Sequence, residues 1–205
     1  MIPEPGKPPL YDLIPLLILA ILCALLITLA HKATRDRIAA NRERAALALI
    51  NEVMPLTHTN DLLKDRIEVT DPTFLGSAAP VSVFRARNQG TPAGVVFMPV
   101  IARGYNGLIE LAVGIARNGE LTGVRVHKHK ETEGLGDRID QHKSHWILGF
   151  THHSLENTPD QAWAVVSDGG EFDQLSGATI TPRGVINAVK KTLNYYAIHK
   201  KALYR

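Results

Sequence analysis

The longest apolar run of the chain lies near its N-terminus. Residues 13–30 contain no charged side chain, and at about 1.5 Å per residue a helix of this length spans most of a hydrocarbon core about 30 Å thick. A cleaved signal peptide usually has a shorter apolar region, of about 7–15 residues, followed by a small-residue cleavage site. Here the basic stretch from His31 to Arg35 follows instead. This favours a retained transmembrane helix over residues 13–31, after an N-terminal tail of residues 1–12.

The segment beyond the apolar run, residues 32–55, is rich in Ala, Arg, Leu and Glu, which are good helix formers. Its apolar positions form only a loose stripe. We therefore expect a helical stalk that continues the membrane helix, ends before Pro55 and acts as a spacer. The remaining residues, 56–205, are expected to form one domain of ordinary size.

Alternating apolar and polar positions predict strands in this domain. Val81–Arg87 alternates as a half-buried strand should, and further β-like runs cover Ala93–Ile101, Leu108–Arg117 and Leu121–His129. The pair Asn118-Gly119 separates the last two runs. Because Asn-Gly suits the positive φ angles of a type I′ turn, it predicts a β-hairpin. Together these runs predict a twisted antiparallel sheet.

The chain ends in a helical pattern. Apolar residues recur there at spacings of three and four, while basic residues lie elsewhere around the helix; the apolar ones are Val185, Ile186, Val189, Leu193 and Tyr196. Thr181 followed by Pro182 resembles an N-cap with proline at the first helical position. The expected fold class is therefore α+β, with a single N-terminal transmembrane helix followed by a twisted antiparallel sheet packed with helices.

Charge and cysteine content exclude several classes of function. The formal net charge is +3, and the basic residues are scattered, with aromatic residues at only 6%. Nucleic-acid binding would require clustered basic residues with interleaved aromatics. The single cysteine, Cys23, lies inside the apolar run, so neither an intrachain disulfide nor a cysteine metal or iron–sulfur site is available. His127 and His129 share one strand face but lack a carboxylate at matching spacing, which favours surface histidines over a metal site.

The segment Asp173–Thr179 carries the most suggestive chemistry. It ends in Ser176-Gly177-Ala178-Thr179 and leads directly into the expected helix start at Thr181. A helix N-terminus offers unpaired N–H groups and the positive end of the helix dipole, which stabilise an anion such as phosphate. Many helices begin with similar residues, so a plain capped helix start without a ligand remains an alternative at this level.

Two further glycine-containing segments flank predicted strands. Glu131-Thr132-Glu133-Gly134-Leu135-Gly136 follows the strand that begins at Leu121, and Gly104-Tyr105-Asn106-Gly107 precedes the strand that begins at Leu108. Each of them, taken alone, is a turn.

The three segments together resemble the membrane-anchored FMN-binding domain family. This family includes the G subunit of the Rnf electron-transport complex and the C subunit of the sodium-pumping NADH:quinone reductase. Its motif Asp-x-x-Ser/Thr-Gly-Ala-Thr is matched in full by Asp173–Thr179, its Glu-Thr-x-Gly-Leu-Gly element by Glu131–Gly136, and its glycine-tyrosine turn by Gly104–Gly107. The resemblance covers essentially the whole chain.

The resemblance implies that FMN is attached covalently, through a phosphoester to Thr179. The other residues that it places at the cofactor are Ser176, Gly177, Ala178, Thr181, Glu131, Thr132, Leu135 and Gly136, with Tyr105 and Trp146 as candidate neighbours of the ring or plain core residues. A threonine hydroxyl is a poor nucleophile, so a flavin transferase that uses FAD is implied, with Asp173 serving its recognition. No catalytic residue and no metal ligand is expected in this chain.

The function that the resemblance implies is electron carriage in a membrane-bound, ion-translocating ferredoxin:NAD oxidoreductase complex. The expected partners are the other Rnf complex subunits and membrane lipid. The alternative is a membrane-anchored, non-redox assembly or binding module. Lys32, Arg35 and Arg37 beyond the apolar run would keep the domain in the cytoplasm by the positive-inside rule. The resemblance instead places it in the periplasm, anchored in the bacterial inner membrane, and we favour that orientation.

Overall fold

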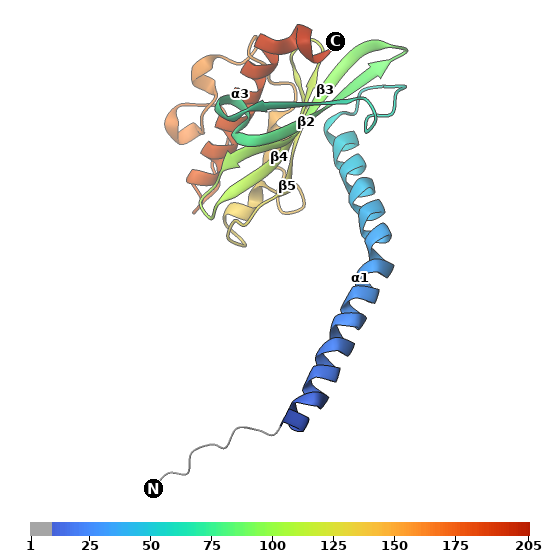
Figure 1. Cartoon of the computed structure of the whole chain (residues 1–205). Coiled ribbons are helices and arrows are strands. Elements are labelled where there is room, and N and C mark those ends of the chain that lie inside the picture. Colours follow the sequence, from blue (N-terminus) through green and yellow to red (C-terminus); the bar gives the residue numbers. More distant parts are fainter. Residues whose placement is uncertain (1–9) are drawn as a thin grey trace. The chain divides into compact units, whose positions relative to one another are not determined.

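The computed structural model describes residues 10–205, with side chains from residue 13, and its elements are shown in Figure 1. The chain divides into two compact units, one ending at Ala45 and one running from Ala46 to Arg205. The expected tail of residues 1–12 lies outside the described residues, except that helix α1 (Leu10–Val53) already begins at Leu10.

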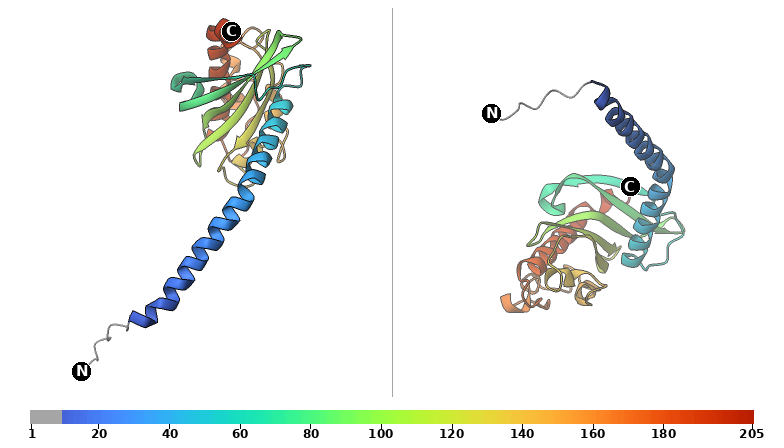
Figure 2. Two further views of the ribbon diagram at one scale, coloured as in Figure 1. Left: turned by 45° about the vertical axis from the view of Figure 1, so that its right-hand side comes forward. Right: turned by 90° about the horizontal axis from the view of Figure 1, so that it is seen from below.

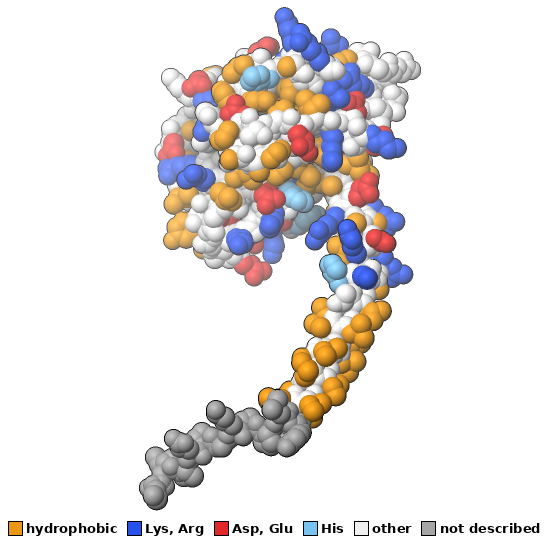
Figure 3. Space-filling model, viewed as in Figure 1, with side chains coloured by type: hydrophobic (Ala, Val, Ile, Leu, Met, Phe, Trp, Pro, Cys, Tyr) orange, Lys and Arg blue, Asp and Glu red, His pale blue; other side chains and the backbone are white. Residues whose placement is uncertain are grey.

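The described part of the first unit is α1 up to Ala45, and the last turns of this helix belong to the second unit. It is the one helix in the described part of the chain that is long and apolar enough to cross a membrane. Large apolar side chains along it are exposed, among them Leu16 at 62% and Ile27 at 71%. Figure 3 shows this apolar surface giving way to Lys and Arg side chains farther along the helix. A soluble helix buries such residues, so this pattern fits the expected single membrane span.

The second unit is built on a five-stranded antiparallel sheet with the strands in sequence order. Its strands are β1 (Arg66–Asp71), β2 (Ser77–Asn88), β3 (Thr91–Arg103), β4 (Leu108–Ala116) and β5 (Leu121–Lys128). The last four contain the four predicted runs nearly in full, which confirms those predictions and the α+β class. Strand β1 and the short helix α2 (Pro72–Leu75) were not predicted.

The hairpin between β4 and β5 is confirmed, but its predicted turn type is wrong. Of Asn118 and Gly119, only the glycine has a positive φ, of 103°. The Gly119 N–H donates to the Ala116 carbonyl at 2.9 Å, and the Ala116 N–H donates to the Glu120 carbonyl at 2.8 Å. This is a longer connection in which a tight turn is followed by one glycine in the left-handed region, instead of a two-residue type I′ loop.

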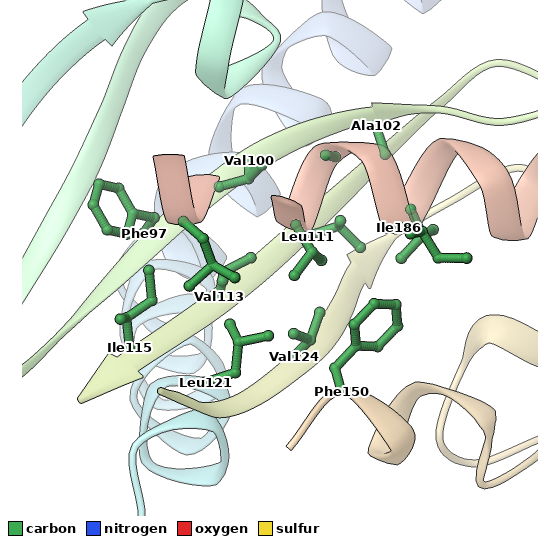
Figure 4. Close-up of a cluster of buried hydrophobic side chains, with 14 of the residues drawn as sticks. Phe97, Val100, Ala102, Leu111, Val113, Ile115, Leu121, Val124, Phe150 and Ile186 are labelled. Atoms are coloured by element: carbon green, nitrogen blue, oxygen red, sulfur yellow. The ribbon is translucent and has the colours of Figure 1, made fainter. Parts of the chain in front are cut away.

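Helix α3 (Ile180–Leu203) covers one face of the sheet, and the main core lies between them. Every apolar residue used to predict this helix, from Val185 to Tyr196, is buried. Alternate residues of the strands face it, such as Phe97 on β3 and Leu111 on β4 (Figure 4). This burial removes a continuous apolar surface from water and is the main source of the domain's stability.

The end of α1 packs on the other face of the sheet, where Ile50, Val53 and Met54 are buried against residues such as Phe84 and Val96. The views of Figure 2 show α3 and this end of α1 on opposite sides of the strands. The end of α1 can approach the sheet this closely only because residue 114 is glycine, since a Cβ there would overlap the Val53 carbonyl. The Thr122 hydroxyl donates a hydrogen bond to the same carbonyl. The spacer interpretation therefore applies only to the earlier part of residues 32–55.

Short 3-10 helices fill the segment between β5 and α3. They are η1 (Gly136–Ile139), η2 (Trp146–Phe150), η3 (Asp160–Ala162) and η4 (Val166–Asp168). Ile139, Ile147 and Phe150 from this segment are fully buried in the main core. That packing holds the Glu131–Gly136 segment and the Asp173–Thr179 segment in fixed positions beside the start of α3.

Candidate functional site

The start of α3 differs from the sequence prediction. The helix begins at Ile180, and Thr179 is its N-cap residue, so the predicted N-cap at Thr181 is wrong. Thr181 lies inside the first turn, is fully buried, and its hydroxyl donates a 2.5 Å hydrogen bond to Glu131 Oε2. Pro182 is tolerated one residue later, because N–H groups in the first turn have no intrahelical acceptor.

The Ser176-Gly177-Ala178 turn presents Thr179 at the helix start. The Ala178 N–H donates to the Leu175 carbonyl at 3.0 Å, and Gly177 has a φ of 78°. This positive φ favours glycine, and a Cβ at Gly177 would lie 2.8 Å from Leu135 Cδ2, so that an added side chain would displace the end of the leucine. The Thr179 side chain is exposed, and its hydroxyl makes no capping hydrogen bond to the described backbone.

Glu131 links the Glu131–Gly136 segment to the Gly104–Gly107 turn and to the first turn of α3. Its carboxylate accepts hydrogen bonds from the N–H groups of Tyr105 (3.3 Å) and Asn106 (3.0 Å), and from the Thr181 hydroxyl. The residue is only 9% exposed. A buried carboxylate requires such donors, and these three come from the Gly104–Gly107 turn and from α3.

A cavity of about 370 Å³ opens at this junction. It is lined by Tyr105, Glu131, Thr132, Leu135, Gly136, Gly177, Ala178, Thr179, Ile180 and Thr181. Its volume falls in the range of about 300–1,000 Å³ that is typical of small-molecule sites. All residues predicted to contact FMN line this cavity except Ser176 and Trp146. The sequence interpretation missed Ile180, although it is the apolar residue directly after the Asp173–Thr179 segment.

The cavity has an apolar rim and a polar base. Tyr105 (71% exposed), Leu135 (42%) and Ile180 (50%) present large apolar surface around it. The hydroxyl of Thr181 and the carboxylate of Glu131 lie deeper, beside the N-terminus of α3. A planar ring can cover the apolar side chains while an anionic group lies at the helix start. This combination of apolar surface and a helix N-terminus fits FMN.

Trp146 and Asp173 lie at a second, larger cavity, of about 660 Å³, that is also lined by residues such as Arg138 and His145. The Trp146 indole N–H donates to the Asp173 backbone carbonyl at 2.6 Å, and the Asp173 side chain is exposed. The structure therefore does not bring Trp146 to the first cavity. Ser176 is exposed on the turn and lines neither of these two cavities.

An ion pair fixes the first turn of α3 to η4. Arg183 Nε and Nη2 donate to Asp168 Oδ2 and Oδ1, each at 2.6 Å. These hydrogen bonds hold the pKa of the Asp168 carboxyl below its ordinary value, while partial desolvation acts in the opposite direction. Within residues 10–205, no group of three His, Cys, Asp or Glu side chains is placed to hold a metal ion.

Comparison with known proteins identifies the family. Residues 14–53 match a family model described as the RnfG N-terminal region, and residues 104–194 match one described as the FMN-binding domain. A relative in Pseudoalteromonas atlantica is named as the G subunit of an ion-translocating oxidoreductase complex; it is 42% identical, over 90% of this chain and 86% of its own length. A relative of the same name in Shewanella loihica is 40% identical, over 90% of this chain and 87% of its own length. A relative of the same name in Pseudomonas aeruginosa is 42% identical, over 87% of this chain and 84% of its own length.

The chain belongs to the family of G subunits of ion-translocating oxidoreductase complexes.

As a member of this family it carries an FMN-binding domain, and the matched residues 104–194 include the whole lining of the first cavity, from Tyr105 to Thr181. The N-terminal match covers nearly all of α1. The resemblance drawn from the sequence is thereby confirmed.

Proposed function

We propose that Thr179 carries FMN as a phosphoester and that the chain is the electron-carrying subunit of its complex. The observation that supports this most strongly is the placement of the Thr179 hydroxyl. It is exposed, uncapped, at the start of α3 and on the lining of a cavity of suitable size. The domain match names FMN as the ligand class, and the covalent link is the additional claim.

The first cavity offers different surroundings to the phosphate and to the ring of FMN. The N–H groups of Ile180 and Thr181, in the first turn of α3, are available to the phosphate next to Thr179. Leu135, Tyr105 and Ile180 provide apolar surface for the ring. When bound, FMN supplies the electron chemistry, and the protein fixes its position and its electrostatic surroundings.

Attachment requires a separate enzyme, since an alcohol such as the Thr179 hydroxyl is a poor nucleophile without an activating base. We propose a flavin transferase with FAD as the donor. The Thr179 Oγ–phosphorus bond forms, the phosphoanhydride bond of FAD breaks, AMP leaves, and a base takes the hydroxyl proton. The exposed side chain of Asp173 lies on the same segment and is available to the transferase.

The wider role extends the family assignment. We propose that the complex exchanges electrons between ferredoxin and NAD, with the other Rnf subunits as partners in the membrane. α1 would cross the bacterial inner membrane once, in contact with lipid, with the domain in the periplasm. Lys32, Arg35 and Arg37 favour the opposite orientation.

Thiol labelling tests the orientation. Glu156 is exposed, and a cysteine in its place should react with an impermeant thiol reagent in intact spheroplasts if the domain is periplasmic. Protection of this cysteine until the cells are lysed would place the domain in the cytoplasm.

The alternative function is a non-redox assembly or binding module whose Asp173–Thr179 segment is only a helix start. Fluorescence on a denaturing gel separates the two. The full chain co-expressed with a flavin transferase should give a fluorescent band, Thr179→Ala should abolish it, and Thr179→Ser should retain part of it. A band of undiminished intensity in Thr179→Ala contradicts attachment at this residue, and absence of any band in the native sequence favours the binding module.

A further inference from the structure

Glu131 is the one charged residue among the described residues that line the first cavity. The others are apolar, glycine or hydroxyl-bearing side chains. Both carboxylate oxygens accept hydrogen bonds, which is the bonding pattern of the ionised form. An ionised Glu131 therefore places a negative charge at the base of the proposed flavin site.

No cation of the described chain neutralises this charge. The donors to Glu131 are two backbone N–H groups and a hydroxyl, and it forms no ion pair with any described residue. The neighbouring Lys128 is exposed and pairs with Glu110 at 3.5 Å, while Lys143 pairs with Glu133 and Asp137. Lys130 is exposed to solvent, which screens its charge, and His129 Nδ1 accepts the Glu131 N–H.

We propose that Glu131 lowers the reduction potential of the FMN held at Thr179. Reduction adds negative charge to the ring, and a carboxylate in the same cavity opposes that addition. A unit charge about 10 Å away, in an effective dielectric of about 20, changes such an equilibrium by about tenfold. The inference rests on the proposed function, because it requires the flavin to occupy this cavity.

The test compares two substitutions with the same change in charge. Glu131→Gln removes the buried carboxylate and keeps its shape, whereas Glu133→Gln removes a carboxylate two residues away whose side chain is 90% exposed. The full chain, purified in detergent with covalent flavin, is titrated against redox dyes while its visible absorbance is followed. Glu131→Gln should raise the midpoint potential by about 59 mV for a one-electron step, the equivalent of tenfold, and Glu133→Gln should leave it unchanged. Equal shifts in the two variants, or none in Glu131→Gln, overturn the inference.

A second pair of variants applies if Glu131→Gln holds no flavin. Thr132 is exposed and lines the same cavity, so Thr132→Glu and Thr132→Gln place a charged and a neutral side chain of equal size there. Thr132→Glu should have the lower midpoint potential, and equal potentials overturn the inference. The fluorescent band keeps the two proposals apart. Native protein without a band contradicts attachment of flavin, whereas a band with unshifted potentials contradicts only the role of Glu131.

Discussion

The Thr181 hydroxyl donates a 2.5 Å hydrogen bond to Glu131 Oε2 and so ties the first turn of α3 to the segment that follows β5. Both residues are buried, at 0% and 9% exposure. The same carboxylate also holds the Gly104–Gly107 turn in place, because it accepts hydrogen bonds from two N–H groups of that turn. The lining of the first cavity is therefore assembled around one side chain.

Removing the Thr181 hydroxyl should destabilise the domain. Thr181→Val leaves a buried carboxylate oxygen with one donor fewer, at a cost of about 1–3 kcal/mol. Thr192→Val is the matched control, because Thr192 is also buried in α3 but donates only to the Ala188 carbonyl of its own helix. Thermal unfolding of the detergent-solubilised full chain measures both. Equal losses of stability would show that the Thr181–Glu131 hydrogen bond contributes no more to stability than the Thr192–Ala188 hydrogen bond.

Two glycines provide the space for the Glu131 carboxylate. A Cβ at Gly104 would overlap Glu131 Oε1, and one at Gly136 would lie 2.6 Å from Oε2. Gly104→Ala and Gly136→Ala should each displace the carboxylate and cost about 1–3 kcal/mol. Gly149→Ala is the control, since nothing in the described chain lies within 4 Å of a Cβ there, and its effect should stay within about 0.5 kcal/mol. Stable Gly104→Ala and Gly136→Ala variants would contradict this geometry.

The docking of the end of α1 depends on Gly114. A Cβ there would overlap the Val53 carbonyl, so Gly114→Ala should displace the helix end from the sheet. The Arg125–Glu52 ion pair, at 3.2 Å, and the Gln141–Glu52 hydrogen bond, at 2.7 Å, should be lost with it. Faster proteolysis near residue 53 in Gly114→Ala than in Gly149→Ala would report this. Equal cleavage rates would contradict the docking.

The Asp168–Arg183 pair predicts a small pH dependence. Hydrogen bonds from Arg183 lower the pKa of Asp168 in the folded state. The ionised Asp168 therefore stabilises the folded state above the ordinary aspartate pKa of about 3.9, and this stabilisation is lost as pH falls through the lower pKa of the folded state. Asp168→Asn should therefore melt slightly below the native chain at pH 6, and the two melting temperatures should converge as the pH falls below about 3.9. High salt should reduce the difference, because the pair is exposed. A gap that widens on acidification would reverse the predicted sign.

The strands of the sheet and helix α3 could be predicted from periodicity because their apolar residues face one core. Strand β1 was missed because only Ile67 and Val69 carry its apolar positions. Thr181 was taken for an N-cap because Thr-Pro is a local helix-start pattern, and its contact with Glu131, fifty residues away, outweighs that local preference. Periodicity could not reveal this contact, nor that the end of α1 is buried against the sheet, since both depend on the tertiary fold.

The site residues themselves came from family resemblance and not from spacing. Tyr105, Leu135 and Thr179 lie far apart in the sequence and meet only in the folded domain. Trp146 shows the limit of that approach, because the indole turns to the Asp173 carbonyl on the other cavity.

Mass spectrometry of the peptide that contains Thr179 locates the flavin on a single residue. The full chain, co-expressed with a flavin transferase, is digested, and the fragment ions locate any added mass. We expect one added FMN phosphoester on Thr179 and an unmodified peptide in Thr179→Ala. An FMN adduct on Ser176 or Thr181, or an unmodified Thr179 in protein that still holds flavin, would contradict it.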